Sequence, residues 1–371
     1  MSPIPICSQI LNWLEDNDRA CMLATDHAMR LELIIKTHNL KEAEEYFEHL
    51  PNFVSKKASA LHLLHFYVKE RATEKAEAFM LKMNMLGLIV SPHPFNEMMK
   101  LYMATLAEEK VLSVIQQMKQ NCIPRNVLSY NLWMDACAQL YGAASAEMVY
   151  KEMLNDKNVV IGWSSFCTLA NIYQKSGLTD KAFWALRQAE KKLSTTNRLG
   201  YLFLLTIYAS LNSKGEVLRL WKLSKSVEGR VTCANHICIM SCLVKLGDIK
   251  EAEKIFLEWE SQCRKYDIRV LNILLGAYSR NGSMKKAESL LIRSLDRGGQ
   301  PNLKTWEILM EGLVRNPEMD TGMDTQHWRS SPSIVVSIVE HVEWTETLKI
   351  QKSILSGIQA LQVHPSESHT A

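Results

Sequence analysis

Three cysteines and one histidine, Cys233, His236, Cys238 and Cys242, lie within ten residues of one another. Thiolate and imidazole groups bind Zn²⁺, and residues four positions apart, such as Cys238 and Cys242, share one face of a helix. These residues fall, however, at helical places where small apolar side chains are expected to form a core. Free cysteine is commonly buried at such places. We therefore interpret the group as part of the core rather than as a metal site.

Other motifs that could support catalysis are incomplete. His341 and Glu343 match the first half of a zinc deaminase signature, but no cysteine follows Cys263 to hold the metal. Phosphate-binding Gly-x-x-x-x-Gly-Lys, nucleophilic Gly-x-Ser-x-Gly and zinc-binding His-Glu-x-x-His motifs are missing from the sequence. We therefore predict no catalytic residue, no metal, no cofactor and no small-molecule substrate, and conclude that the protein is not an enzyme.

The composition favours an all-α protein. Of 371 residues, 47% are hydrophobic, and only 15 Gly and 10 Pro interrupt long stretches rich in good helix formers. The net charge of +3 does not by itself indicate nucleic-acid binding, so any basic surface must be local. The nine cysteines are unevenly spaced and no secretory signal precedes them, which indicates reduced thiols. No apolar run is long enough to span a membrane.

One sequence unit recurs along most of the chain. A small residue, followed four positions later by a large apolar one, recurs at intervals of 33, 35, 35, 36, 35, 35 and 35 residues, at Ala43, Ala76, Val111, Ala146, Ala182, Val217, Ala252 and Ala287. Because residues four apart lie on one helical face, each unit is predicted to contain an amphipathic helix there. Each of these helices follows another predicted helix, which begins near the first place of its unit. Those first places are Ala24, Lys57, Pro92, Val127, Trp163, Arg198, Cys233, Ile268 and Leu303.

Two helices every 35 residues predict an all-α fold, an α-α superhelix made as a right-handed solenoid of about nine helix-turn-helix repeats. This period, together with "SYN" after "PRNV" and "QPN" before "LKTWEI", resembles the pentatricopeptide repeat family, specifically its plant class of 35-residue units and a short organellar type. Tetratricopeptide units are 34 residues long and carry a Trp-x-x-Leu-Gly signature, which this sequence lacks.

The resemblance covers residues 24–314, which we expect to form the solenoid. Residues 1–23 are interpreted as the second helix of a truncated repeat, with no transit peptide in this chain. Residues 315–332 contain two Pro and one Gly among polar residues, including Glu318, Asp320 and Asp324, and are predicted to form a loop. Residues 333–363 are predicted to form a C-terminal helical cap, and residues 364–371 a disordered tail.

Proteins of this family bind single-stranded RNA one base per unit, through the side chains at the fifth and last places of the unit. By this resemblance, the candidate base-reading residues are Asn96, Asn126, Asn131, Asn197, Asp267, Asn272 and Asn302. Only Asn96 with Asn126 and Asn272 with Asn302 form a residue pair that is common in the family. Asn131 has the matching residue at the fifth place but not at the last. The alternative is that each Asn caps the start of a helix.

Cations at the thirteenth place are implied RNA phosphate contacts, namely Lys36, Lys69, Lys175, Lys245, Arg280 and Arg315. A cation is also favoured at a helix C-terminus by the helix dipole, so both interpretations stay open.

The implied function is sequence-selective binding of single-stranded RNA in plant organelles, in RNA processing, stability or translation. By resemblance the location is mitochondrial, and plastids are the less favoured organelle. The alternative is a protein-interaction scaffold with ribosomal or other protein partners. We predict no membrane partner.

Overall fold

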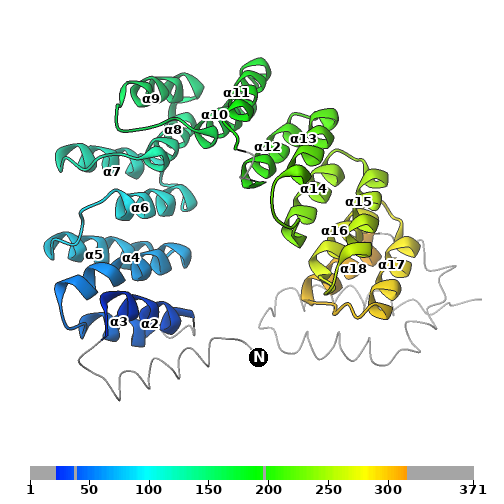
Figure 1. The fold of residues 1–371 in the computed structure, drawn as a ribbon, viewed down its shortest axis with the longest axis horizontal. Helices are drawn as coiled ribbons and strands as arrows, with labels where there is room; N and C mark the ends of the chain where they lie inside the picture. The colour runs from blue at the N-terminus through cyan, green and yellow to red at the C-terminus, as the bar shows by residue number, and fades with distance from the viewer. Residues whose placement is uncertain (1–21, 37–39, 195–197, 316–371) are drawn as a thin grey trace, which may run out of the picture. The chain divides into compact units, whose positions relative to one another are not determined.

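The structure is a computed structural model that describes residues 22–36, 40–194 and 198–315, and every secondary-structure element in these ranges is an α-helix (Figure 1). The first helices of the successive hairpins are α2 (Ala24–Lys36), α4 (Phe53–Lys69), α6 (His93–Ala104), α8 (Val127–Tyr141), α10 (Trp163–Lys175), α12 (Arg198–Ser210), α14 (Cys233–Lys245), α16 (Ile268–Arg280) and α18 (Leu303–Arg315). The second helices are α3 (Leu40–Glu48), α5 (Thr73–Met85), α7 (Glu108–Gln120), α9 (Ala143–Asn155), α11 (Thr179–Lys191), α13 (Lys214–Ser226), α15 (Ile249–Gln262) and α17 (Met284–Asp296).

The helices start where the period predicts, with two exceptions. Helix α6 begins one residue late, because Pro92 is its N-cap residue rather than its first helical residue. Helix α4 begins four residues early, at Phe53. The Oδ1 atom of Asn52 accepts a hydrogen bond from the Ser55 amide at 2.8 Å, so the cap lies before the repeat boundary and lengthens the helix.

The helices group into two compact units. The first contains the described residues up to Ser213 together with 222–228, and the second contains 214–221 together with 229–315. In each unit the first helices pack side by side as one layer, from α2 to α12 and from α14 to α18. Second helices such as α5 and α15 pack on the first helix of their own hairpin and on that of the next. The first helices therefore present one continuous face within each unit.

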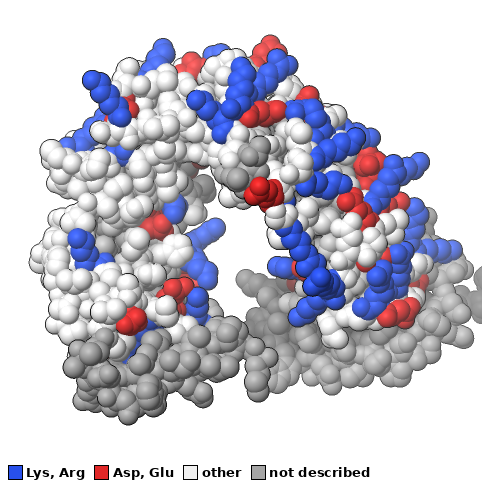
Figure 2. Space-filling view, viewed as in Figure 1, with Lys and Arg blue, Asp and Glu red and all other residues white. Residues whose placement is uncertain are grey.

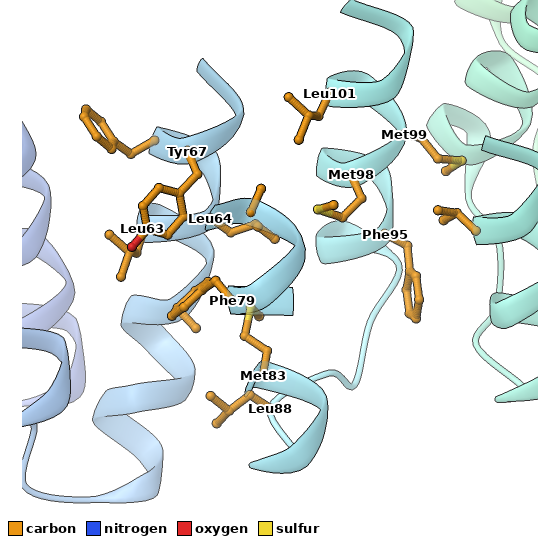
Figure 3. Close-up of a cluster of buried hydrophobic side chains, with 14 of the residues drawn as sticks. Leu63, Leu64, Tyr67, Phe79, Met83, Leu88, Phe95, Met98, Met99 and Leu101 are labelled. Carbon is orange, nitrogen blue, oxygen red and sulfur yellow. The ribbon is translucent and has the colours of Figure 1, made fainter. Parts of the chain in front are cut away.

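The small residues that define the period lie in the core. All eight, from Ala43 to Ala287, are completely buried. Of the large residues four positions later, Met80 and Tyr150 are half-buried and the other six are buried. Figure 3 shows the resulting contact in the first unit, where side chains of α4, α5 and α6, including Leu64, Phe79 and Met98, meet between the helices. Burial of this shared seam stabilises hairpins that could not fold alone.

A polar cluster repeats where successive hairpins meet. In one copy the Tyr102 hydroxyl of α6 donates to Glu77 of α5 at 2.9 Å, and the Lys110 ammonium of α7 donates to the same carboxylate at 2.8 Å. One side chain comes from the earlier hairpin and two from the later one, so the cluster joins neighbours. We call the four copies the Tyr–Glu–Lys clusters: Tyr67–Glu44–Lys75, Tyr102–Glu77–Lys110, Tyr173–Glu147–Lys181 and Tyr278–Glu253–Lys286.

The prediction of an all-α superhelix of helical hairpins is confirmed for the described residues. No helix among them is long and apolar enough to cross a membrane. The repeat remnant predicted at 1–23 lies almost wholly outside the described residues. Of the predicted loop at 315–332 only Arg315 is described, as the last residue of α18, and the predicted C-terminal cap and tail lie outside the described residues.

Candidate nucleic-acid interface

Two of the predicted base-reading residues, Asn96 and Asn126, are joined by a third residue, Ser129. Asn96 lies in the first turn of α6, and Asn126 is the N-cap residue of the next first helix, α8. The Asn96 Nδ2 group donates to Asn126 Oδ1 at 3.1 Å, and the Ser129 hydroxyl donates to Asn96 Oδ1 at 2.7 Å. Asn96 is only 1% exposed. Its amide is therefore held on both sides by the neighbouring hairpin.

The same arrangement recurs in the second unit, with Asn272, Asn302 and Thr305. Asn272 Nδ2 donates to Asn302 Oδ1 at 3.3 Å, and the Thr305 hydroxyl donates to Asn272 Oδ1 at 2.9 Å. Asn272 is 9% exposed and Thr305 is completely buried. We call these two groups the amide triads. Two copies in separate units, at equivalent places of the repeat, show that the arrangement follows from the sequence unit itself.

Helix capping explains why the triads form. Asn126 Oδ1 accepts a hydrogen bond from the backbone N–H of Ser129 at 2.9 Å, and the Ser129 hydroxyl oxygen accepts one from the backbone N–H of Asn126 at 3.3 Å. This reciprocal pair is a capping box. Asn302 and Thr305 exchange the same two bonds at 3.0 and 3.1 Å. The capping alternative therefore applies to Asn126 and Asn302, which lie at helix starts, whereas Asn96 and Asn272 lie within helices and bond to the cap of the next one.

A third copy is incomplete. Asn131 occupies the fifth place of its unit, but the last place is Gly162, which has no side chain to complete the pair. Both Asn131 Oδ1 and the Ser165 hydroxyl are buried without a hydrogen-bond partner. A buried polar atom left without a partner costs free energy, so this place differs physically from the two amide triads.

Of the two remaining predicted base-reading residues, the structure describes only Asp267. Asp267 is the N-cap residue of α16, where it accepts the Arg269 amide at 3.0 Å and forms an ion pair with the Arg269 guanidinium at 2.7 Å. The hydrogen bonds from Arg269 lower the pKa of the Asp267 carboxyl, against the opposing effect of burial. Asn197 lies outside the described residues.

The six predicted phosphate contacts are all exposed, and each is the last residue of a first helix. Lys36 forms an ion pair with Glu32 at 2.7 Å, and Arg315 with Glu311 at 3.6 Å. Lys69, Lys175 and Arg280 have no acidic partner within the described chain. Because a cation at this place also suits the helix dipole, the position alone does not separate the two interpretations.

One first helix of the first unit carries a buried acidic side chain. Glu97 of α6 is 8% exposed and accepts from Lys100 at 2.6 Å and from the His65 ring of α4 at 2.9 Å. Burial raises the pKa of Glu97, but the hydrogen bonds from Lys100 and His65 outweigh it, and the pKa is lowered. The carboxylate is therefore charged at neutral pH and locally neutralised by its partners. Sequence reasoning did not identify this group.

Two members of the cysteine and histidine group lie in the packed core, whereas Cys233 and Cys238 are half-buried. Cys242 and His236 are each 4% exposed, and His236 packs edge-on against Trp221 with ring centroids 5.5 Å apart. The Nδ1 atom of His236 lies 3.0 Å from the Thr232 carbonyl oxygen. In the part of the chain that the structure describes, no three His, Cys, Asp or Glu residues are grouped so as to hold a metal ion.

Charge is unevenly distributed over the surface. On the face shown in Figure 2, much of the first unit is uncharged, whereas Lys and Arg side chains lie among Asp and Glu over the second. Basic residues are thus local features rather than a uniform coat, as the modest net charge of +3 requires.

Comparison with family models finds two matches. The model described as "Pentatricopeptide repeat domain" matches residues 79–139, and the model described as "PPR repeat" matches residues 237–263 and 269–299. The matched ranges contain Asn96, Asn126 and Asn131 of the first unit and Asn272 of the second.

Curated relatives match over most of the chain. A pentatricopeptide repeat-containing protein of Arabidopsis thaliana is 54% identical over 355 residues, covering 92% of this chain and 72% of the relative. Another, named as mitochondrial, is 34% identical and covers 85% and 59%. The large ribosomal subunit protein mL101 (rPPR4) of the same plant is 33% identical and covers 91% and 70%. The chain thus spans between about three-fifths and three-quarters of these relatives.

Among solved structures, the pentatricopeptide repeat protein PPR10, in complex with an 18-nt psaJ RNA element, is similar in fold. Its TM-score is 0.55 at 15% sequence identity, and the match covers 91% of this chain and 53% of that chain. At this identity the likeness concerns the fold alone, which agrees with the helical hairpins described above.

Proposed function

Because this chain belongs to the pentatricopeptide repeat family, we propose that it binds single-stranded RNA selectively, without catalysis. Its role is the processing, stability or translation of transcripts in plant mitochondria. The observation that carries this proposal is the pair of amide triads, which hold one carboxamide at the same place of the first-helix layer in each unit. Each of these carboxamides has a second Nδ2 hydrogen outside the triad, which can donate to an acceptor on a base edge.

Three further observations support the proposal. Exposed cations end six of the first helices, and a cation at the end of a base-binding helix is well placed to meet a phosphate. PPR10, which shares the fold, was solved with RNA bound. Several relatives carry the word mitochondrial in their names, which supports the proposed organelle.

Selection from a pool of short single-stranded RNAs of random sequence tests the proposal. We expect the protein to enrich a short motif, and Asn96→Ala and Asn272→Ala each to weaken the preference at one base of it. Asn84→Ala is the matched control, because Asn84 is an exposed carboxamide on the second helix α5. Failure of the unmodified protein to enrich any sequence at physiological salt would contradict the proposal.

A second candidate is a protein-interaction scaffold that associates with the ribosome. Its support is the similarity to ribosomal protein mL101 and the apolar residues Leu61, Leu202 and Ile237 at fifth places, where a base-reading amide would be needed. Crosslinking in isolated mitochondria distinguishes the two. RNA contacts spread over ribosomal RNA, with sedimentation alongside ribosomes after messenger RNA digestion, favour the scaffold. A short common footprint within a messenger RNA favours the first proposal.

A further inference from the structure

Wherever the fifth place of a unit is asparagine, the third place of the next unit carries a hydroxyl. Asn96 is followed by Ser129, Asn131 by Ser165, and Asn272 by Thr305. After Leu61, Cys167, Leu202 and Ile237 at the fifth place, the third place of the next unit is Pro94, Gly200, Asn235 and Val270. The exception is Ser59, which follows Ala28 and whose hydroxyl is buried without a partner. The hydroxyl is therefore associated with the amide and is not simply a general feature of helix starts.

The hydroxyl determines which way the amide points. In the first triad the single proton of the Ser129 hydroxyl has two acceptors within reach, Asn96 Oδ1 at 2.7 Å and Asn126 Oδ1 at 3.0 Å, and the shorter contact is the one to Asn96. This bond places oxygen rather than nitrogen toward Ser129, and the Asn96 Nδ2 group then faces Asn126 Oδ1 at 3.1 Å. One Nδ2 hydrogen stays outside these bonds. Because the side chain is held at both ends, this second hydrogen is the only donor that it can offer a base.

The incomplete copy indicates that the three residues act together. Ser165 and Asn131 occupy the places of Ser129 and Asn96, yet neither Asn131 Oδ1 nor the Ser165 hydroxyl has a partner. The residue that differs is Gly162, which stands where Asn126 stands in the complete triad. Without the carboxamide at the last place, the hydroxyl and the fifth-place amide do not bond. The orientation of Asn131 is therefore not fixed.

We propose that Ser129 and Thr305 are specificity-determining positioning residues, which hold the Asn96 and Asn272 amides with a defined donor toward the base. This inference rests on the proposed RNA binding and deepens it: selectivity at these places depends on three residues, and the third belongs to the next repeat. Because every base has some acceptor on its edge, the fixed donor selects by position: it favours a base with a carbonyl oxygen or ring nitrogen at the place it meets, and disfavours one with an amino group there. The unit of Asn131 lacks a fixed donor and does not discriminate between bases.

Ser129→Ala tests the positioning role. We expect discrimination at one base of the selected motif to fall about fivefold, which corresponds to one neutral hydrogen bond. The melting temperature should also fall, because Ser129 is buried and bonds to the backbone N–H of Asn126 as well. Ser129→Thr should restore discrimination, because Thr305 does this work in the other triad. Ser59→Ala is the matched control, since it removes a buried hydroxyl at the same place of α4, where no amide is present to be oriented.

Gly162→Asn tests the same inference by adding the carboxamide that the incomplete copy lacks. The backbone at Gly162 has φ −106° and ψ −174°, almost the conformation of Asn126, with φ −108° and ψ 178°. An added Cβ would meet no atom within 4 Å. The new carboxamide can therefore cap Ser165 and bond to Asn131, as Asn126 does with its partners. We expect the variant to acquire a preference at the base next to the one discriminated by Asn96, and to melt at a higher temperature.

The outcomes separate the inference from the proposed function. If the unmodified protein enriches a motif, and Ser129→Ala keeps the same discrimination at every base while Gly162→Asn adds none, the positioning role is wrong and RNA binding stands. If the unmodified protein enriches no RNA, the proposed function fails and the inference fails with it. Loss of discrimination in Ser129→Ala, recovery in Ser129→Thr and a new preference in Gly162→Asn support the inference.

Discussion

At the scale of the residue, the Tyr–Glu–Lys clusters show how polar side chains join one repeat to the next. In the copy built on Glu77, the carboxylate receives a tyrosine hydroxyl and a lysine ammonium, and the ammonium also lies 5.3 Å from the centre of the Tyr102 ring. At two of the junctions that lack the cluster, Leu112 and Leu218 take the place of the Glu, and Cys137 and Leu243 take that of the Tyr. There, both polar partners are replaced by less polar residues, so neither leaves an unpaired group.

We predict that Tyr102→Phe destabilises the first unit by about 1 kcal/mol, because it removes one hydrogen bond to a partly buried carboxylate and little packing. Urea denaturation followed by tryptophan fluorescence measures the change. Tyr141→Phe is the control, since Tyr141 is 63% exposed and its hydroxyl has no partner in the described chain. An equal effect of the two substitutions would show that the cluster adds nothing.

The same clusters predict a dependence of stability on pH. A hydrogen bond from Lys110 lowers the pKa of Glu77, and one from Lys181 lowers the pKa of Glu147, with burial opposing both. A carboxyl whose pKa is lowered by folding stabilises the fold above its unfolded pKa, ordinarily 4.5, and this contribution is lost as the pH falls through the folded value. The contribution should therefore be complete at pH 7 and begin to decline as the pH falls to about 4.5.

Melting temperatures between pH 7 and pH 3 test this dependence. We expect Glu77→Gln combined with Glu147→Gln to melt lower than the unmodified protein at pH 7, and the difference to shrink below about pH 4.5. Glu109→Gln serves as the control, because Glu109 is exposed and has no ion pair in the described ranges. A difference that stays constant with pH would assign the effect to packing rather than to charge.

At this scale, the sequence could predict residues at individual places of the repeat, but not their contacts with the next repeat. Asn96, Asn126, Asn272 and Asn302 could be selected as pairs, and the structure brings each pair within hydrogen-bond distance. Ser129 and Thr305 were not selected, because their role depends on contacts across a repeat boundary. Spacing alone could have revealed them, since an asparagine at the fifth place is always followed by a hydroxyl 33 or 34 residues later.

At the scale of the element, most hairpins turn through a residue in the left-handed conformation. Glycine supplies it at Gly177, Gly247 and Gly282, each of which follows a first helix and can adopt positive φ without strain. Arg71, Leu106 and Asn212 adopt the same conformation at the equivalent turns, with φ of 54°, 56° and 56°. The turn geometry is therefore set by the stacking of the hairpins, and tertiary packing overrides the local preference of the residue.

Leu106→Gly is predicted to stabilise the first unit by about 0.5–1 kcal/mol, because it removes the left-handed strain while the greater freedom of glycine in the unfolded chain offsets part of the gain. Little packing is lost, since Leu106 is 81% exposed. Thermal unfolding detects the change. The contrasting variant is Leu81→Gly, at an exposed place inside α5, which should lose about 1 kcal/mol. Destabilisation by Leu106→Gly would mean that the side chain contributes more than the strain costs.

The positions of the elements were the most predictable feature of the molecule. A period in small and large apolar residues identifies the helical face that must be buried, and all eight small residues are completely buried. Helix starts were less certain because they depend on the cap, as the early start of α4 at Asn52 shows. Residues such as Glu97 and His65, which meet across α6 and α4, could not be paired, because the period does not state which residues of neighbouring helices lie opposite.

At the scale of the whole molecule, affinity for RNA should be distributed over many weak contacts in both units. Within the described residues two amide triads are complete, and Cys167, Leu202 and Ile237 place non-amide side chains at three other fifth places. Few bases are therefore selected, and electrostatic attraction along the first-helix layer must supply much of the binding free energy. Such binding is sensitive to salt in proportion to the number of phosphate contacts.

We predict that log affinity for single-stranded RNA falls against log salt concentration with a slope of about −4, the value for six phosphate contacts. Combined substitution of Lys69, Lys175 and Arg280 by Gln should make the slope less steep by about 2, because these cations have no competing acidic partner within the described residues. Fluorescence anisotropy of a labelled oligonucleotide at several salt concentrations gives both slopes. Replacing Lys41, Lys191 and Lys250, which lie on second helices, removes the same charge and should leave the slope nearly unchanged. If both triple variants shift the slope equally, RNA responds to the net charge of the protein, and the cations at the ends of the first helices serve only their helix dipoles.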